Sequence, residues 1–535
     1  MNRVVIVGSG ASGVHFAWSV LSKGYDVVML DVGRVKPTVV RPQDSFLDLK
    51  QRLDDPVRYF LGRDYEAVVY PGSAGEYYGS PPNKSYVFST PPAFATRTSG
   101  FAPLTSFAQG GLAEAWTAGA YPLDDADLNE FPFRFRDLEP YYVEVANRIG
   151  VTGVADDLAR FFPVHDGLME PLRLDRHSAL LLERYDRQKK TFSRDLGCYM
   201  GRSRVATLSA EHHGRQACSY LGRCLWGCPT GSLYTPLATL EACRQLPNFT
   251  YTPNVYVRHL RVGPRRQISS AVVESADGRE RTEIAGDRFV LAAGTLSTSK
   301  IYMRTVKEET GETIVLRGLM DNRQILVPFL NLSLIGRRYD PDTYQYHQVA
   351  MGIDAPALPG YVHAQITTLK TALIHPIVQN LPIDLRTALT LFRTVRAGLG
   401  VLNINLRDDR RQDNCVTLGG NRPGAPELVI RYAPPASEPE LMKRALRIVR
   451  TALRRLGCVV PPGMSHIRPM GASVHYAGTI PMVSAKGPHT ATPECQSSEY
   501  ENLHFVDGTT FPSLPAKNLT FTLMANAVRV AARNF

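Results

Sequence analysis

The start of the chain alternates between short apolar runs and one amphipathic stretch. Val4-Val5-Ile6-Val7 is a run of β-branched residues, which is typical of a strand covered on both faces of a parallel sheet. Residues 12–23 place apolar side chains on one helical face and are followed by Gly24, so they predict a helix. Asp26 to Asp31 predicts a second strand. Together these segments predict the opening βαβ unit of an α/β fold.

Similar patterns return in separated parts of the chain. Residues 288–294 predict a strand and turn that lead into a helix from Thr295 to Arg304. Residues 320–460 are rich in predicted strands, with one or two helices that include Glu438 to Leu456. The closing segment 506–534 again resembles the first fold. We therefore expect an α/β protein, α+β overall, whose first domain is assembled from separated pieces.

A second domain, built on an antiparallel sheet, is expected to be inserted between those pieces. The predicted boundaries are 1–130, 200–305 and 462–535 for the first domain, and 131–199 and 306–461 for the second.

A glycine-rich turn joins the first strand to the first helix. Gly8-Ser9-Gly10-Ala11-Ser12-Gly13 is a G-x-G-x-x-G motif, in which Gly8 permits the tight turn and Gly10 admits a pyrophosphate close to the backbone. Gly13 allows the helix to lie close to the strand, and the helix N-terminus attracts an anion. Asp31 ends the second strand, where a carboxylate can bind ribose hydroxyls. The motif predicts a dinucleotide site but does not by itself distinguish FAD from NAD.

Charge and hydropathy exclude several other classes of protein. The formal net charge is +11, but the basic residues are scattered, and the nearest approach to a run, residues 407–411, is mixed in sign. No nucleic-acid-binding motif accompanies this charge, so we expect no nucleic-acid partner. No stretch of 18 apolar residues is free of charges, which argues against a membrane span. Because the first strand follows Met1 almost at once, a cytoplasmic protein is expected.

An amphipathic stretch from Ile377 to Leu399 mixes leucines with arginines. A helix packed on the protein's own core is favoured over peripheral membrane contact, which stays a less favoured interpretation. The eight cysteines of a cytosolic chain indicate thiols or metal ligands before disulfides.

Five further segments resemble one enzyme family, the glucose–methanol–choline (GMC) oxidoreductases. The C-terminal residues 502–525 are similar to that family's ending, and His475-Tyr476-Ala477-Gly478-Thr479-Ile480-Pro481-Met482 is similar to its histidine signature. Gly110-Gly111 with Trp116 and Gly119, residues 290–303 and residues 137–142 also match, the last especially in the sugar-dehydrogenase branch. The resemblance covers most of the chain and is loose over residues 320–460.

The resemblance implies an FAD-binding Rossmann-like domain and a substrate site over the flavin. His475 and Asn518 are expected to face the substrate. The residues expected to contact FAD are Gly8, Gly10, Ala11, Ser12, Gly13, Asp31, Gly110, Gly111, Val257, Ala293, Asp507, Gly508 and Thr520.

His475 and Asn518 suit the oxidation of an alcohol. Imidazole is the natural base for a hydroxyl proton near neutral pH. Asn518 can orient the substrate oxygen without titrating, and it occupies a position where other family members carry histidine or asparagine. The expected substrate is a small alcohol such as a sugar, polyol or glycoside, and the electron acceptor is left open between oxygen, a quinone and a redox protein.

Three cysteines follow one another closely at Cys218, Cys224 and Cys228, and Pro229 follows the last. Three nearby thiolates suit three corners of an iron–sulfur cluster, and the spacing resembles that of family members with a [3Fe–4S] cluster. The filling between the first two cysteines departs from theirs. Both a cluster and a loop of buried thiols stay open, and the other cysteines are expected to be structural.

Two other functions stay open beside alcohol oxidation. A lyase on the same fold would bind FAD without using its redox chemistry, and an electron-transferring flavoprotein would not need His475. Substrate-dependent bleaching of the flavin separates the oxidoreductase from the lyase.

Overall fold

A five-stranded parallel sheet forms around the predicted strand at residues 4–7. Its strand order is β22-β11-β1-β2-β7, and all its pairings are parallel. The strands are β1 (Arg3–Val7), β2 (Asp26–Leu30), β7 (Phe249–Thr252), β11 (Arg288–Leu291) and β22 (Leu503–Phe505). The sheet therefore takes strands from the start, the middle and the end of the chain, which the computed structural model describes over residues 3–68, 80–163, 166–369, 378, 381–420 and 427–535.

Both faces of this sheet are covered, as its run of β-branched residues predicts. Val4 and Ile6 pack in one apolar cluster with helices on the first face, and Val5 and Val7 pack in another cluster on the second face. The first face carries α1 (Ala11–Leu21), α5 (Phe135–Ile149), α8 (Pro236–Arg244) and α13 (Thr520–Asn534). The second carries α9 (Thr295–Thr310) and the antiparallel strands β8 (Val255–Val262), β9 (Ile268–Ser275) and β10 (Arg281–Ala285).

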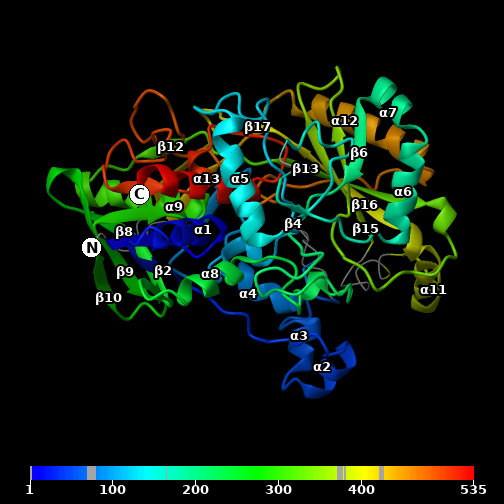
Figure 1. Cartoon of the computed structure of the whole chain (residues 1–535), viewed down its shortest axis with the longest axis horizontal. Helices are drawn as coiled ribbons and strands as arrows, with labels where there is room; N and C mark the ends of the chain where they lie inside the picture. Colours follow the sequence, from blue (N-terminus) through cyan, green and yellow to red (C-terminus); the bar gives the residue numbers. More distant parts are fainter. Residues whose placement is uncertain (1–2, 69–79, 164–165, 370–377, 379–380, 421–426) are drawn as a thin grey trace.

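A larger antiparallel sheet lies beside this body, on the right of Figure 1. Its order is β20-β13-β16-β15-β14-β6, with β21 paired to β13. The strands are β6 (Cys198–Arg202), β13 (Arg323–Asn331), β14 (Val349–Ile353), β15 (Val362–Thr368), β16 (Leu399–Leu406), β20 (Cys458–Val459) and β21 (His466–Ile467). An antiparallel sheet in the middle of the chain is what the sequence predicts, and the domain limits proposed from the sequence stay a prediction.

The two faces of this sheet differ in polarity because side chains alternate along each strand. Ile325, Ala364, Ile366, Leu402 and Ile404 point to one face. That face is covered by α6 (Arg176–Asp186), α7 (Lys189–Leu196) and α12 (Glu438–Arg455). The residues between them in sequence point to the opposite face, which is rich in amides and hydroxyls and faces a cavity.

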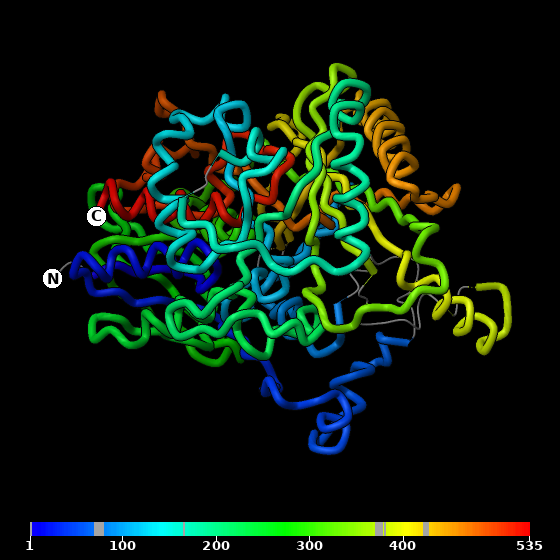
Figure 2. Tube along the Cα trace, turned by 45° about the vertical axis from the view of Figure 1, so that its right-hand side comes forward, coloured from blue at the N-terminus to red at the C-terminus, as the bar shows by residue number. Residues whose placement is uncertain are grey.

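The remaining elements include a lobe that projects from the body. The helices α2 (Phe46–Arg52) and α3 (Pro56–Leu61) form this lobe, which is blue in Figures 1 and 2. Tyr59 of α3 stacks on Trp226 with ring centroids 5.6 Å apart, which joins the lobe to the cysteine loop. The other elements are α4 (Ser85–Phe88), β3 (Thr96–Ser99), β4 (Val151–Thr152), β5 (Leu168–Met169), β12 (Val315–Arg317), α11 (Leu385–Val395), β17 (Asp408–Asp409), β18 (Cys415–Gly419), β19 (Glu427–Arg431) and β23 (Ser513–Leu514).

The predicted helices form, with small differences at their ends. The helix predicted from Thr295 to Arg304 continues to Thr310 and ends where Gly311 takes a left-handed conformation. Within the amphipathic stretch, α11 buries Ala388 and Phe392 against Val378. Ile377 lies outside the described residues. Among the helices that the structure describes, none combines the length and the apolar character that a bilayer crossing requires.

The alternation of apolar and polar side chains along the strands of the antiparallel sheet can be tested by mutation. Ile404 is fully buried under α12, so Ile404→Ala should lower the free energy of unfolding by about 2–5 kcal/mol through lost contacts and a cavity. Asn403 points to the opposite face, and Asn403→Ala should cost much less stability. Thermal unfolding of both variants checks this, and an equal loss in the two would contradict the assignment of the faces.

Candidate active site

A cavity of about 580 Å³ is lined by residues from both sheets. Its walls include the glycine-rich turn, the end of β2 and the polar face of the antiparallel sheet. The predicted site residues that line it are Gly8, Gly10, Ala11, Ser12, Asp31, Gly111, Val257, Ala293, His475, Asp507, Gly508, Asn518 and Thr520. Gly13 and Gly110 do not line the cavity, but each adjoins a lining residue, Ser12 and Gly111 respectively. Residues from the whole length of the chain are therefore brought to one place.

The three glycines of the turn have different surroundings. A Cβ on Gly8, which has φ of +104°, would lie 2.6 Å from the carbonyl oxygen of Ala292. A Cβ on Gly13 would lie 2.1 Å from the carbonyl oxygen of Gly8, so side chains are excluded at both positions by the fold itself. No atom lies within 4 Å of the place where a Cβ on Gly10 would stand. Gly10 therefore keeps open the space above the N-terminus of α1.

Asp31 is held at the end of β2 by two hydroxyl groups. Ser9 Oγ and Tyr251 Oη both donate to its Oδ2, the second at 3.1 Å. Burial raises the pKa of Asp31 to about 6, against these hydrogen bonds, which lower it. Ser9 Oγ also accepts from the backbone N–H of Gly110 at 3.0 Å. Ser9 thus joins the first glycine turn to the Gly110-Gly111 loop, a link that no local sequence pattern indicates.

Asp507 ties the C-terminal part of the site to α9. Its Oδ2 accepts from the N–H of Gly294 at 3.0 Å and from Thr298 Oγ1 at 2.5 Å. A Cβ on the neighbouring Gly508 would lie 2.3 Å from the carbonyl oxygen of Tyr476, so the backbone there is closely packed. These contacts fix the position of the wall that carries the C-terminal site residues.

The residues of the cavity fit an FAD cofactor. The open space over Gly10 suits a pyrophosphate, because free N–H groups and the positive end of the α1 dipole meet there. Asp31 stands where an adenosine ribose would lie, and the cavity continues from it to the antiparallel sheet. Contact of each predicted residue with FAD stays a prediction.

His475 and Asn518 line the far part of the same cavity. The Nδ1 atom of His475 lies 2.9 Å from Oδ1 of Asn322, and Oδ1 of Asn518 accepts from Nε2 of Gln365 at 2.7 Å. Burial, assisted by the positive charge of Arg468, lowers the pKa of His475 to about 4. The imidazole is therefore neutral near pH 7 and can accept a proton.

The polar face of the antiparallel sheet completes this part of the cavity. Its lining side chains include Gln324, Gln365, Thr367 and Asn403, which come from three neighbouring strands. Sequence reasoning missed these residues and Asn322. The sequence feature that could have identified them is the alternation of polar and apolar residues along strands that are buried on both faces.

The cysteine loop does not support an iron–sulfur cluster. Cys218, Cys224 and Cys228 lie near one another, and burial raises the pKa of Cys218 and that of Cys224, the latter to about 12. Burial also acts on Cys228, but hydrogen bonds from Leu233, Ser232 and Thr230 outweigh it and lower its pKa. Among the described residues no group of three His, Cys, Asp or Glu side chains is arranged to hold a metal ion. The alternative of a loop of thiols agrees with this geometry.

Comparison with known proteins agrees with the fit of the cavity to FAD. Residues 410–527 match the sequence model of the C-terminal region of GMC oxidoreductases. The chain is 24% identical to paromamine 6'-oxidase of Streptomyces fradiae, over 99% of the chain and 90% of that enzyme. These matches confirm the resemblance to GMC oxidoreductases drawn from the motifs of the chain, and with it the expectation of an FAD-dependent oxidoreductase.

Solved structures show the same fold at low identity. Pyridoxine 4-oxidase from Mesorbium loti superposes with a TM-score of 0.63 at 17% identity, over 100% of this chain and 99% of that one. The R554A variant of formate oxidase from Aspergillus oryzae RIB40 gives a TM-score of 0.64 at 13% identity, over 99% and 98%. The predicted fold class is therefore confirmed.

Gly10 provides a test of the cofactor site that is separate from folding. Gly10→Ala adds a methyl group to open space, so the protein should fold normally but lose most of its FAD binding, because the methyl group occupies the space for the pyrophosphate. The ratio of flavin to protein absorbance after reconstitution measures this. Gly487→Ala is the control, since its Cβ would make an ordinary 3.6 Å contact. Normal FAD content in Gly10→Ala would contradict the assignment of the pyrophosphate site.

Proposed function

We propose that this enzyme oxidises a hydroxyl group of a small polyhydroxylated molecule, such as a sugar, polyol or glycoside. The observation that carries the proposal is one shared cavity. His475, Asn518 and the polar face of the antiparallel sheet line the same space as the glycine-rich turn. When bound, FAD supplies the acceptor for the hydride of the carbinol carbon.

His475 acts as the base in this proposal. Its low pKa keeps the ring neutral near pH 7, so a ring nitrogen is available for the hydroxyl proton. Asn518 orients the substrate oxygen, and its own side chain is held by Gln365. His475 itself is only 9% exposed, so the base has little contact with water.

The substrate class follows from the amides and hydroxyls around the base. Gln324, Asn403 and Thr367 offer both donors and acceptors, which suits several hydroxyl groups on one molecule better than an apolar alcohol. The name of the curated relative describes an oxidase of paromamine, and that of the first structural relative describes an oxidase of pyridoxine. Both compounds belong in the first set of candidate substrates.

An anaerobic substrate screen tests the proposed function. The FAD-loaded enzyme is mixed without oxygen with sugars, polyols, paromamine, pyridoxine and simple apolar alcohols. Bleaching of the flavin by a polyhydroxylated compound supports the proposal, and bleaching only by apolar alcohols contradicts the substrate class. Conversion of a compound without any bleaching would favour a lyase.

Replacement of His475 tests its role as the base. His475→Ala should retain FAD and lower the rate of flavin reduction by about 10²–10⁴-fold, because general-base catalysis is lost. Stopped-flow absorbance without oxygen measures the rate. The control is His213→Ala, which changes an exposed histidine that does not line the cavity. A near-normal rate in His475→Ala would overturn the assignment of the base.

A further inference from the structure

A single buried amide holds the imidazole of His475. Asn322 is 1% exposed and its Oδ1 lies 2.9 Å from Nδ1 of the ring. It immediately precedes β13, on the strand side of the cavity.

The orientation of this amide is fixed by two backbone carbonyl groups. Nδ2 of Asn322 donates to the carbonyl oxygen of Leu406 at 2.8 Å and to that of Pro515 at 3.0 Å. A carbonyl oxygen only accepts, so the NH₂ group must face these two atoms and the amide oxygen must face the ring. Since the amide oxygen also only accepts, Nδ1 of His475 must carry a proton. In the neutral ring Nε2 then has the free lone pair.

Asp321 fixes the backbone that carries the same histidine. Its Oδ2 accepts from the N–H of Gly471 at 2.6 Å, and its Oδ1 accepts from Ser473 Oγ. Ser473 Oγ in turn accepts from the N–H of His475 at 3.0 Å. Two neighbouring residues, Asp321 and Asn322, thus fix the main chain and the ring of His475 respectively.

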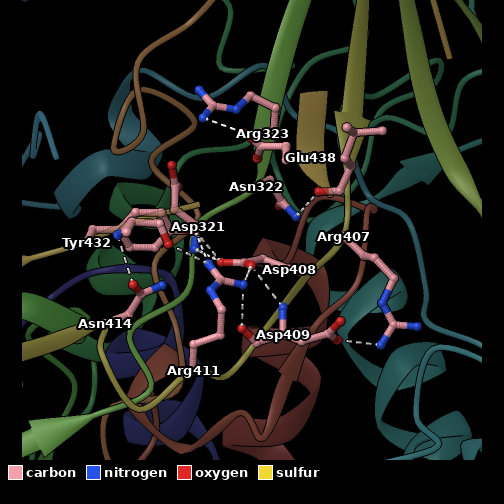
Figure 3. A network of polar contacts seen from close by, with 12 residues as sticks. Asp321, Asn322, Arg323, Arg407, Asp408, Asp409, Arg411, Asn414, Tyr432 and Glu438 are labelled. Carbon is pink, nitrogen blue, oxygen red and sulfur yellow. Dashed lines mark hydrogen bonds and ion pairs between the residues drawn. The ribbon is translucent and has the colours of Figure 1, made fainter. Parts of the chain in front are cut away.

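These two residues are themselves anchored in a wider polar network, drawn in Figure 3. The N–H of Asp321 donates to Oδ2 of Asp408 at 3.1 Å. Asp408 also accepts from Tyr432 Oη at 2.5 Å and from Nη1 of Arg411 at 2.6 Å. Every partner of Asp408 in this set comes from a different part of the chain from His475. Asp408 and its partners thus hold the backbone next to Asn322 from outside the segment that carries His475.

We propose that Asn322 is a positioning residue that selects the Nδ1-protonated tautomer of His475 and leaves Nε2 as the atom that takes the substrate proton. This inference rests on the proposed role of His475 as the base. It assigns that role to one nitrogen and names the residue that enforces it.

The neutral charge of Asn322 matters as much as its position. Two charged or titratable groups act electrostatically on the ring, Arg468 and His363 of β15, and Asp321 binds Ser473 two residues before His475. An amide accepts the Nδ1 proton without favouring a positively charged ring. A carboxylate in the same place would favour the imidazolium, because an opposite charge within hydrogen-bonding distance stabilises the charged form.

Asn322→Asp tests this directly, and the readout needs no substrate. The FAD-loaded enzyme is labelled with ¹⁵N-histidine, and the ring signals of His475 are those absent in His475→Ala. In the wild type these signals should show the Nδ1-protonated neutral ring throughout pH 5–8, since its pKa is about 4. In Asn322→Asp the titration should move up by about 1–3 pH units. The matched control is Asn331→Asp at the far end of β13, whose new carboxylate would face Nη1 of Arg184, and it should leave the titration unmoved.

Asn322→Leu tests the choice of tautomer. Without the acceptor, the His475 signals should show both neutral tautomers, and flavin reduction by the best alcohol of the screen should slow about tenfold or more while FAD content is kept. Unchanged tautomer and titration in both Asn322 variants would overturn the inference. If His475→Ala reduces flavin normally, the proposed base role fails instead, so the two failures are distinguishable.

Discussion

A polar group removed from water must find a hydrogen-bond partner, and this requirement determines the structure of the site. Burying an unpaired polar group costs on the order of 1–3 kcal/mol. Asp31 and Asp507 therefore bind hydroxyl and N–H groups, and Asn322 uses both ends of its amide. Each of these bonds joins parts of the chain that are far apart in sequence. The network that satisfies the buried groups is the same network that places the chemical groups around one cavity.

The alternation of side chains in the antiparallel sheet makes this arrangement possible. One face buries apolar residues under α12 and stabilises the domain, while the other presents amides to the cavity. A substitution on the apolar face should lower the stability of the protein. A substitution on the polar face should instead affect the binding of the substrate. The neutral His475 follows from the same burial, because removal from water lowers the pKa of its ring.

The sequence alone predicted the parts of the site that depend on local pattern. The βαβ unit, the glycine turn and Asp31 follow from apolar periodicity and spacing, and the family resemblance brought in His475 and Asn518. The contacts of Ser9 with Gly110 and of Asn322 with His475 could not be predicted, because each joins residues more than a hundred positions apart. The cysteine spacing left a metal cluster and a loop of thiols both open, and the geometry of the described residues does not support the cluster, since three nearby thiols need not converge on one point.

The central claim is that a carbinol carbon gives up its hydride in the cavity that contains His475. The most direct test is anaerobic reduction of the FAD-loaded enzyme by a primary alcohol that carries two deuterium atoms at the reacting carbon. The account predicts slower flavin bleaching than with the unlabelled alcohol and a product that has lost one deuterium. A product that retains both deuterium atoms, or turnover without bleaching, would contradict it.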